Sequence, residues 1–224
     1  MHITPLGDAA LVVHVCRGFE EDAERCLTAV TDARARLVAA RLPGVIEIAP
    51  AFTTVAVFFD PLRTDELENG IETALRKPSS RRRGKVRTID VPVCYDEEFA
   101  PDLGDVAARA ALTTAAVVKL HARASYRVAC VGFTPGFPYL AGLPRAIATP
   151  RRQSPRKAVA AGSVAIGGGQ TGIYPHASPG GWNIIGRTPL RLFDPEAVPP
   201  SLLVMGDEVR FRQITRAEFD RVSR

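Results

Sequence analysis

Strand-like and helical patterns of apolar positions alternate along residues 3–77 of the chain. Residues 3–6, 9–15, 44–48 and 54–59 are short apolar runs and are predicted to form strands. Residues 20–40 are predicted to form an amphipathic helix, because apolar positions recur there at helical spacing: Ala23, Cys26, Leu27, Val30 and Leu37. A second helix is predicted over residues 64–77, with acidic residues in its first turn and basic ones in its last: Asp65, Glu66, Arg76 and Lys77.

This order predicts a small α+β domain with a ferredoxin-like fold and both helices on one face of an antiparallel sheet. The pattern then stops. Residues 78–85 are polar and without periodicity, and they include three consecutive arginines at 81–83. Such a stretch is typical of a linker, so the sequence predicts two domains, an α+β domain over 1–80 and a second domain over 86–224.

The second domain begins with a strand and two helices. Ile89, Val91 and Val93 alternate with polar positions, which predicts a half-buried strand. Helices are predicted over 102–111 and 113–124, the latter with Thr113 as its N-cap and His121 on its apolar face.

Short predicted strands separated by turns follow, over 126–131, 163–166, 182–185, 190–193 and 208–212. This spacing favours a closed or nearly closed β-barrel. A last short helix is predicted after Thr215, which forms a capping box with Glu218, while Ile214 and Phe219 are placed for a hydrophobic staple.

Composition is ordinary for a soluble globular protein: 46% of the residues are hydrophobic, 24% are charged, and the mean hydropathy is +0.02. No apolar run approaches the roughly 18 residues of a membrane span, and the N-terminus lacks the features of a signal peptide, so we expect a cytoplasmic protein. The cysteines show no C-x-x-C pair and are predicted to be reduced core thiols: Cys16, Cys26, Cys94 and Cys130.

The net charge of +5 comes mostly from arginine, with one concentration at residues 81–87. A nucleic-acid site would be expected to interleave aromatic residues with these charges, and none are present. We therefore interpret the run as a solvated basic linker.

Residues 131–189 combine glycine, proline and aromatic residues at a density seen nowhere else in the chain. Prolines fix φ and glycines permit unusual backbone paths, so such a stretch is expected to present a binding site. Its aromatic residues are predicted to line a pocket or an interface, although core packing accounts equally well for at least two of them: Phe133, Phe137, Tyr139, Tyr174 and Trp182.

The polar candidates in this region each have a structural alternative. The glycine loop 167–172 is not a phosphate-binding loop, because Ile173 stands where a lysine is needed; either Gln170 and Thr171 face a pocket or the loop is only a turn. His121 and His176 are either site residues or ordinary structural histidines, and the four histidines lack the spacing of a metal site.

Three arginines flank the rigid dipeptide Ser154-Pro155: Arg151, Arg152 and Arg156. Guanidinium groups held on such a turn can bind a carboxylate or a phosphate through paired hydrogen bonds. The alternative is a solvated basic loop.

Several linked motifs in this region resemble one known family. They are Gly132-Phe-Thr-Pro-Gly-Phe-Pro-Tyr-Leu140, Thr149-Pro-Arg-Arg152, Pro155-Arg156, Ala161-Gly-Ser-Val164, Gln170-Thr-Gly-Ile-Tyr-Pro175, Pro179-Gly-Gly-Trp182 and Ile185-Gly-Arg-Thr-Pro189. In this order they resemble the KipI family, also described as allophanate hydrolase subunit 1. The one departure is Ala160, where relatives usually carry proline. The resemblance implies an N-terminal α+β domain followed by a cyclophilin-like β-barrel.

The resemblance also implies an activity. Bacterial members of the family act with two partners, 5-oxoprolinase subunits C and A, as an ATP-dependent enzyme that hydrolyses 5-oxo-L-proline to L-glutamate. A subunit of this kind is expected to be inactive alone; ATP is used by the complex, and this chain shows no nucleotide motif or metal site of its own. Arg156, Arg187 and His121 are the expected catalytic residues, and Gln170, Thr171 and Tyr174 are expected to orient the substrate.

Two other activities share these motifs. The family includes inhibitors of sensor histidine kinases, for which the aromatic loops would be a protein interface. A carboxyltransferase component of urea or allophanate metabolism is the third possibility. The sequence does not separate them.

Overall fold

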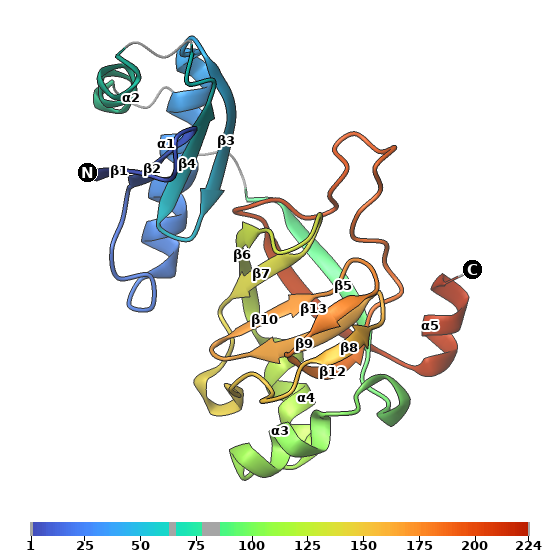
Figure 1. Cartoon of the computed structure of the whole chain (residues 1–224). Helices are drawn as coiled ribbons and strands as arrows, with labels where there is room; N and C mark the ends of the chain where they lie inside the picture. Colours follow the sequence, from blue (N-terminus) through green and yellow to red (C-terminus); the bar gives the residue numbers. More distant parts are fainter. Residues whose placement is uncertain (1, 63–65, 78–85, 224) are drawn as a thin grey trace. The chain divides into compact units, whose positions relative to one another are not determined.

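The computed structural model describes residues 2–62, 66–77 and 86–223 (Figure 1). Within it the chain divides into two compact units, Met1–Lys85 and Val86–Arg224. The predicted linker at 78–85 and the predicted start of the second helix, Thr64 and Asp65, lie outside the described residues.

The first unit is a four-stranded antiparallel sheet with two helices. The sheet order is β1-β2-β4-β3, with β1 His2–Pro5, β2 Ala10–His14, β3 Val45–Ala51 and β4 Thr54–Phe59. Helix α1, Ala23–Ala40, packs on β3 and β4, and α2, Leu67–Arg76, packs against α1. Most residues predicted for one face of α1 enter the core, where Leu27 and Val30 are fully buried with Val55 and Val57 of β4, while Ala23 is half-buried.

Two details of this unit differ from expectation. The elements follow the order β-β-α-β-β-α, whereas a ferredoxin-like domain reads β-α-β-β-α-β, so the ferredoxin-like topology is not confirmed. Cys16 and Cys26 are joined by a disulfide across a Cα–Cα distance of 5.4 Å, which corrects the interpretation of all the cysteines as reduced. Cys94 and Cys130 are free thiols, as expected.

The second unit is built around a closed barrel, as the strand spacing predicted. Its strands follow the order β10-β7-β6-β13-β5-β12-β9. They are β5 Thr88–Cys94, β6 Ser125–Val131, β7 Pro138–Ala141, β9 Ser163–Gly167, β10 Gln170–Ile173, β12 Asn183–Arg187 and β13 Glu208–Ile214. All pairs are antiparallel except β13 with β5, which run parallel from Glu208–Thr88 to Ile214–Cys94.

The barrel interior forms the main core of this unit. Val128, Leu140, Val164, Ile166 and Ile173 point inward and are fully buried. Helices α3, Leu103–Ala110, and α4, Thr114–Arg123, pack against each other and add Val106 and Val117 to the same core (Figure 1). Thr113 caps α4 as predicted, with its side chain accepting a hydrogen bond from the backbone N–H of Ala116.

Smaller elements complete the unit. A two-stranded sheet, β8 Arg156–Val159 with β11 Ser178–Gly180, lies outside the barrel ladder. Short 3-10 helices span Glu97–Phe99 and Arg145–Ile147, and α5, Arg216–Val222, starts with the predicted capping box of Thr215 and Glu218. Among the described residues no helix combines the length and apolar character needed to cross a membrane.

Two predictions for this unit were wrong. Residues 190–193 form no strand; Phe193 makes one isolated bridge to Ser201, and Leu192 enters the core without joining a ladder. Arg87, the described end of the basic run, is not a solvated linker residue, because it hydrogen-bonds the buried carboxylate of Asp207 (Nε to Oδ1, 3.0 Å) and the carbonyl of Leu202.

Candidate functional site

The five aromatic residues predicted to lie at a site do come together. Phe137 is their centre: its ring meets those of Phe133, Tyr139, Tyr174 and Trp182 edge to face at centroid distances of 5.0–5.6 Å. We call these residues the aromatic cluster. They pack with Ala165 and Val159, whereas Val164 and Ile166, the neighbours of Ala165 on β9, point into the barrel. The cluster therefore lies on the outer side of the barrel wall.

Glycines of β9, β10 and β11 let the aromatic rings approach the backbone. A Cβ added to Gly167 would lie 2.5 Å from the ring of Trp182, and one added to Gly172 would lie 2.9 Å from that of Phe137. Likewise, a Cβ on Gly180 would lie 2.2 Å from the hydroxyl of Tyr174. Phe137, Tyr174 and Trp182 are buried as a result, Tyr139 is half-buried, and Phe133 is 63% exposed.

The basic loop beside the cluster is held by one buried carboxylate. Asp102 is only 1% exposed, and its Oδ1 accepts hydrogen bonds from Arg152 Nη1 and Arg156 Nη2, both at 2.8 Å. Its Oδ2 accepts from Arg156 Nη1 at 2.9 Å and from the backbone N–H of Ile184 at 2.7 Å. Arg156, an expected catalytic residue, is thus engaged in an ion pair that ties the loop to β12.

Arg151 is the arginine of this loop that meets the aromatic cluster. Its Cζ lies over the ring of Trp182, 5.7 Å from the centroid, and its side chain is exposed. The same guanidinium acts electrostatically on Tyr139, whose pKa is raised mainly by burial and lowered to a smaller extent by Arg151. The sequence placed Arg151 in a group of candidates without distinguishing it from its neighbours.

His121 lies in the interior of the unit, fully buried, and stacks on Phe211 with ring centroids 4.5 Å apart. The Thr171 hydroxyl donates to the carbonyl of Ala165 at 2.9 Å, so it must accept from His121 Nε2 at 3.0 Å. Nδ1 then accepts from the hydroxyl of Tyr95 at 2.8 Å. Burial lowers the pKa of His121 to about 3, so this histidine is neutral and both of its nitrogens are used.

The remaining predicted residues lie in different places. Gln170 is half-buried and opposes Gly167, the glycine beneath Trp182. His176 is exposed, and its Nε2 lies 2.6 Å from the hydroxyl of Thr134 in the loop that carries Phe133. Arg187 is not part of the cluster: its Nε donates to the carbonyl of Ala161, and its guanidinium lies over the rings of Phe99 and Phe219.

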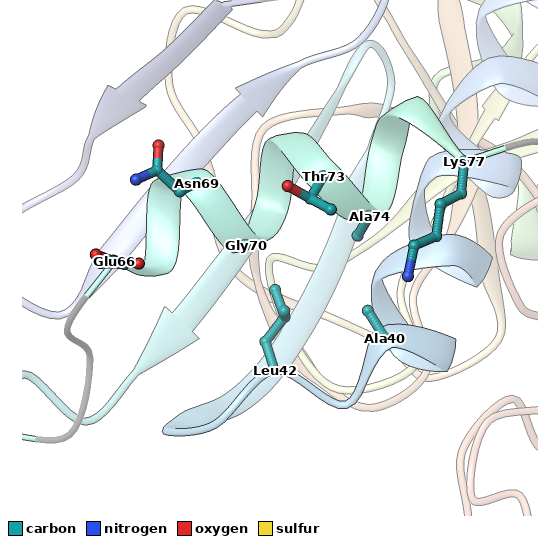
Figure 2. A pocket seen from close by; sticks show the side chains of 8 residues that line it. All are labelled: Ala40, Leu42, Glu66, Asn69, Gly70, Thr73, Ala74 and Lys77. Carbon is teal, nitrogen blue, oxygen red and sulfur yellow. The ribbon is translucent and has the colours of Figure 1, made fainter.

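The first unit contains a pocket between α2 and the end of α1 (Figure 2). Leu42, Ala40 and Ala74 contribute its apolar lining, and Glu66, Asn69, Thr73 and Lys77 its polar side chains. Gly70 allows Leu42 to approach α2, since an added Cβ would lie 3.1 Å from Leu42 Cδ2. The predicted motifs contribute nothing to this pocket, so we place the candidate site on the barrel unit.

Asp102 and Tyr95 are the site-supporting residues that the sequence did not reveal. Asp102 was predicted only as the first residue of a helix; in the structure its side chain makes no cap hydrogen bond to α3 and contacts the arginines instead. Its arginine partners lie 50 and 54 positions further along the chain, a distance over which no local pattern connects them. Tyr95 carried no signal beyond its position next to a predicted strand.

Comparison with known proteins adds the following relatives. Residues 1–203 match the family described as carboxyltransferase domain, subdomain C and D. The chain is 38% identical to the B subunit of 5-oxoprolinase from Bacillus subtilis over 97% of this chain and 94% of that one. It is 45% identical to the corresponding 5-oxoprolinase subunit of Escherichia coli O157:H7 over 76% of this chain and 78% of that one.

Solved structures agree with this placement. TTHA0988 is 37% identical with a TM-score of 0.78 over 92% of this chain, which spans only 40% of the TTHA0988 chain. The structure of PH0987 from Pyrococcus horikoshii is 40% identical over 97% of this chain and 100% of its own, with a TM-score of 0.59.

The urea carboxylase of Kluyveromyces lactis shares only the fold, at 19% identity and a TM-score of 0.78 over 98% of this chain and 22% of that one. The family match covers residues 1–203, and the relative from Bacillus subtilis aligns over nearly the whole chain. Both matches include the motifs around the aromatic cluster. The chain therefore belongs to the carboxyltransferase subdomain C and D family, the family that the motifs of residues 131–189 indicated.

Proposed function

We propose that this chain is a subunit of a 5-oxoprolinase that hydrolyses 5-oxo-L-proline to L-glutamate at the expense of ATP. The observation that carries the proposal is its similarity, along almost its whole length, to the B subunit of 5-oxoprolinase from Bacillus subtilis. The relatives favour this activity over inhibition of a histidine kinase. The designation of these relatives as one subunit supports partner subunits, which we take to be subunits C and A.

The chemistry of the reaction explains why a partner is needed. A lactam carbonyl is a poor electrophile, and transfer of a phosphoryl group from ATP to its oxygen makes the carbon susceptible to water. Attack by one water on that carbon breaks the ring C–N bond, the nitrogen takes up a proton, and an acyl phosphate is left on the opened chain. A second water hydrolyses the acyl phosphate to the side-chain carboxylate and inorganic phosphate. Phosphoryl transfer depends on positioning and on charge stabilisation, which we assign mainly to the partner subunits.

This chain supplies the surface that holds the ring. The aromatic cluster offers apolar area for the ring methylenes, and Gln170 and Tyr139, both half-buried, offer polar groups for the amide. Arg156 positions the loop that carries Arg151 and Arg152, because both of its terminal nitrogens donate to the carboxylate of Asp102. His121 likewise positions Thr171 on β10 and does not relay protons, because its two nitrogens are already hydrogen-bonded.

The proposal is tested by reconstitution. Glutamate release that depends on both 5-oxoproline and ATP is measured with the purified chain alone and after mixing with subunits C and A. We expect release only from the full mixture. Absence of glutamate from a mixture in which all three proteins are folded contradicts the proposed function, and release by the chain alone contradicts its dependence on partners.

A further inference from the structure

We propose that Arg151, held on the face of Trp182, binds the carboxylate of the substrate. This inference rests on the proposed function and names the residue that recognises the acid group of 5-oxoproline. Hydrolysis of the lactam needs contacts to the ring amide, whereas a carboxylate on the ring calls for a separate cation. Three features favour Arg151: the charge partners of the neighbouring arginines, the fixed backbone of its loop, and the chemistry of the adjacent surface.

Arg152 and Arg156 differ from Arg151 in their charge partners. Both donate to the buried carboxylate of Asp102, and their side chains are 33% and 25% exposed. No carboxylate is paired with Arg151 in the part of the chain that the structure describes, and its side chain is exposed. Arg151 is therefore the member of the loop whose guanidinium is available to an incoming anion.

The backbone on both sides of Arg151 is fixed. Thr149 forms a backbone bridge with Gly168, with N···O distances of 3.2 and 2.7 Å. The Asn183 side chain donates to the carbonyl of Pro150 at 2.9 Å, and the N–H of Arg152 donates to the carbonyl of Gly181 at 2.7 Å. Residues 149, 150 and 152 are thus all anchored to the barrel, so the Cα position of Arg151 is set by the same contacts.

The side chain of Arg151 lies over a buried, closely packed aromatic ring. Trp182 is 5% exposed and is packed between Phe137, Tyr139 and the backbone of Gly167. A guanidinium over such a ring keeps its N–H donors along its edge, where a carboxylate accepts two parallel hydrogen bonds. Because little rotamer freedom remains to be lost, binding here costs less entropy than at a mobile arginine.

The neighbouring groups favour a carboxylate on a small ring over a polyphosphate. Tyr139 lies close enough for Arg151 to act on it electrostatically, and burial raises its pKa, so its hydroxyl stays protonated and adds no negative charge beside Arg151. A polyphosphate would need several cations, and Arg152 and Arg156 are already paired with Asp102. One cation, one hydroxyl and an apolar surface fit a monoanion with a methylene ring.

Binding is measured without partners through the emission of Trp182, which is the one tryptophan of the chain. The ligands are 5-oxoproline, 2-pyrrolidinone, which has the same ring without the carboxylate, and inorganic phosphate. We expect a saturable change with 5-oxoproline only, absent in Arg151→Ala and retained in Arg145→Ala, a control at another exposed arginine of this unit.

Kinetics of the reconstituted complex give the second measurement. Because Arg151→Ala removes a charged hydrogen-bond donor, we expect its KM for 5-oxoproline to rise about 10- to 100-fold, with a smaller change in kcat. Arg151→Lys keeps the charge but not the paired donors, so its KM should lie between those of wild type and Arg151→Ala. Thermal unfolding of each variant confirms that it is folded. A raised KM supports the proposal whether or not the isolated chain responds in emission.

The outcomes separate the inference from the proposed function. If the wild-type complex releases glutamate and Arg151→Ala has an unchanged KM, the inference is overturned and the function stands. If the wild-type complex is inactive, the proposed function is contradicted, and the emission titration alone tests the binding site. A response to 5-oxoproline that is lost in Arg151→Ala then supports the site. Absence of any response of the wild-type chain to 5-oxoproline overturns it. With an inactive complex, a response to phosphate but not to 5-oxoproline likewise overturns the site.

Discussion

Arg156 donates two hydrogen bonds to the carboxylate of Asp102, at 2.9 and 2.8 Å, across 54 positions of the sequence. The pair joins the segment before α3 to the strand β8 that covers the barrel wall. Since Ile184 of β12 also donates to Asp102, one buried acid connects three segments around the candidate site.

Replacing this acid is therefore expected to loosen the whole region. Asp102→Asn leaves two partly exposed arginines without their counter-charge, and the loss of these charged hydrogen bonds costs about 1.5–3 kcal/mol. Urea unfolding measures the loss. Asp105→Asn, at an exposed position of α3, serves as the control and should leave the unfolding free energy within about 0.5 kcal/mol of wild type. Equal stability of the two variants contradicts the role given to Asp102.

The buried histidine predicts a loss of stability in acid. The pKa of His121 is about 3 in the folded chain and 6.5 when unperturbed, so the unfolded chain binds the proton more tightly. Stability is full above pH 6.5 and falls as the pH drops toward 3, by about 1.4 kcal/mol per pH unit from this group. Unfolding between pH 7 and 5 should show a shallower slope for His121→Gln, while the exposed His176→Gln keeps the wild-type slope. Equal slopes of stability against pH for wild type and His121→Gln would contradict the lowered pKa of His121.

The contact between Gly167 and Trp182 predicts a local steric effect. In Gly167→Ala the new Cβ would lie 2.5 Å from the indole, so the ring must move, and overpacking of this kind costs about 1–3 kcal/mol. Gly169→Ala is the matched control, because nothing lies within 4 Å of an added Cβ there. Tryptophan emission reports the movement of the indole ring, and the Tm reports the loss of stability. An unchanged spectrum in Gly167→Ala would show that the indole does not lie against this glycine.

The capping box at the start of α5 gives a fourth prediction. The side chain of Thr215 accepts from the N–H of Glu218, and the Glu218 carboxylate accepts from the N–H of Thr215. Thr215→Ala should cost about 1 kcal/mol, whereas Thr215→Ser keeps the hydroxyl and most of the stability. Thermal unfolding of the pair checks this, and equal losses in both variants would indicate that the methyl group matters more than the cap.

Local sequence patterns were sufficient to predict the helices and strands that have a clear apolar spacing or a capping residue. The helical spacing around Leu27 and the cap at Thr113 specified α1 and α4, and the alternation of Ile89, Val91 and Val93 specified β5. The strands β8 and β10 were missed because their sequences, Arg-Lys-Ala-Val and Gln-Thr-Gly-Ile, show no alternation of polar and apolar residues. Their pairing partners, not their own residues, make them strands.

The candidate site was predictable in its location but not in its charges. Aromatic residues on a stretch rich in glycine and proline pointed to the cluster around Phe137. The choice among Arg151, Arg152 and Arg156 depends on where Asp102 lies in space, and only the folded chain shows that. His121 was correctly expected on an apolar helix face, but its contact with Thr171 joins residues 50 positions apart.

The parallel pairing of β13 with β5 has a consequence for how the chain emerges from the ribosome. Every described strand and helix of the first unit lies within residues 2–76, so that unit can fold while the rest is being translated. The barrel has to wait, because β5 at its beginning remains an open edge until β13 at residues 208–214 has been made. We infer that the first unit can fold before the barrel closes, because closure requires residues 208–214.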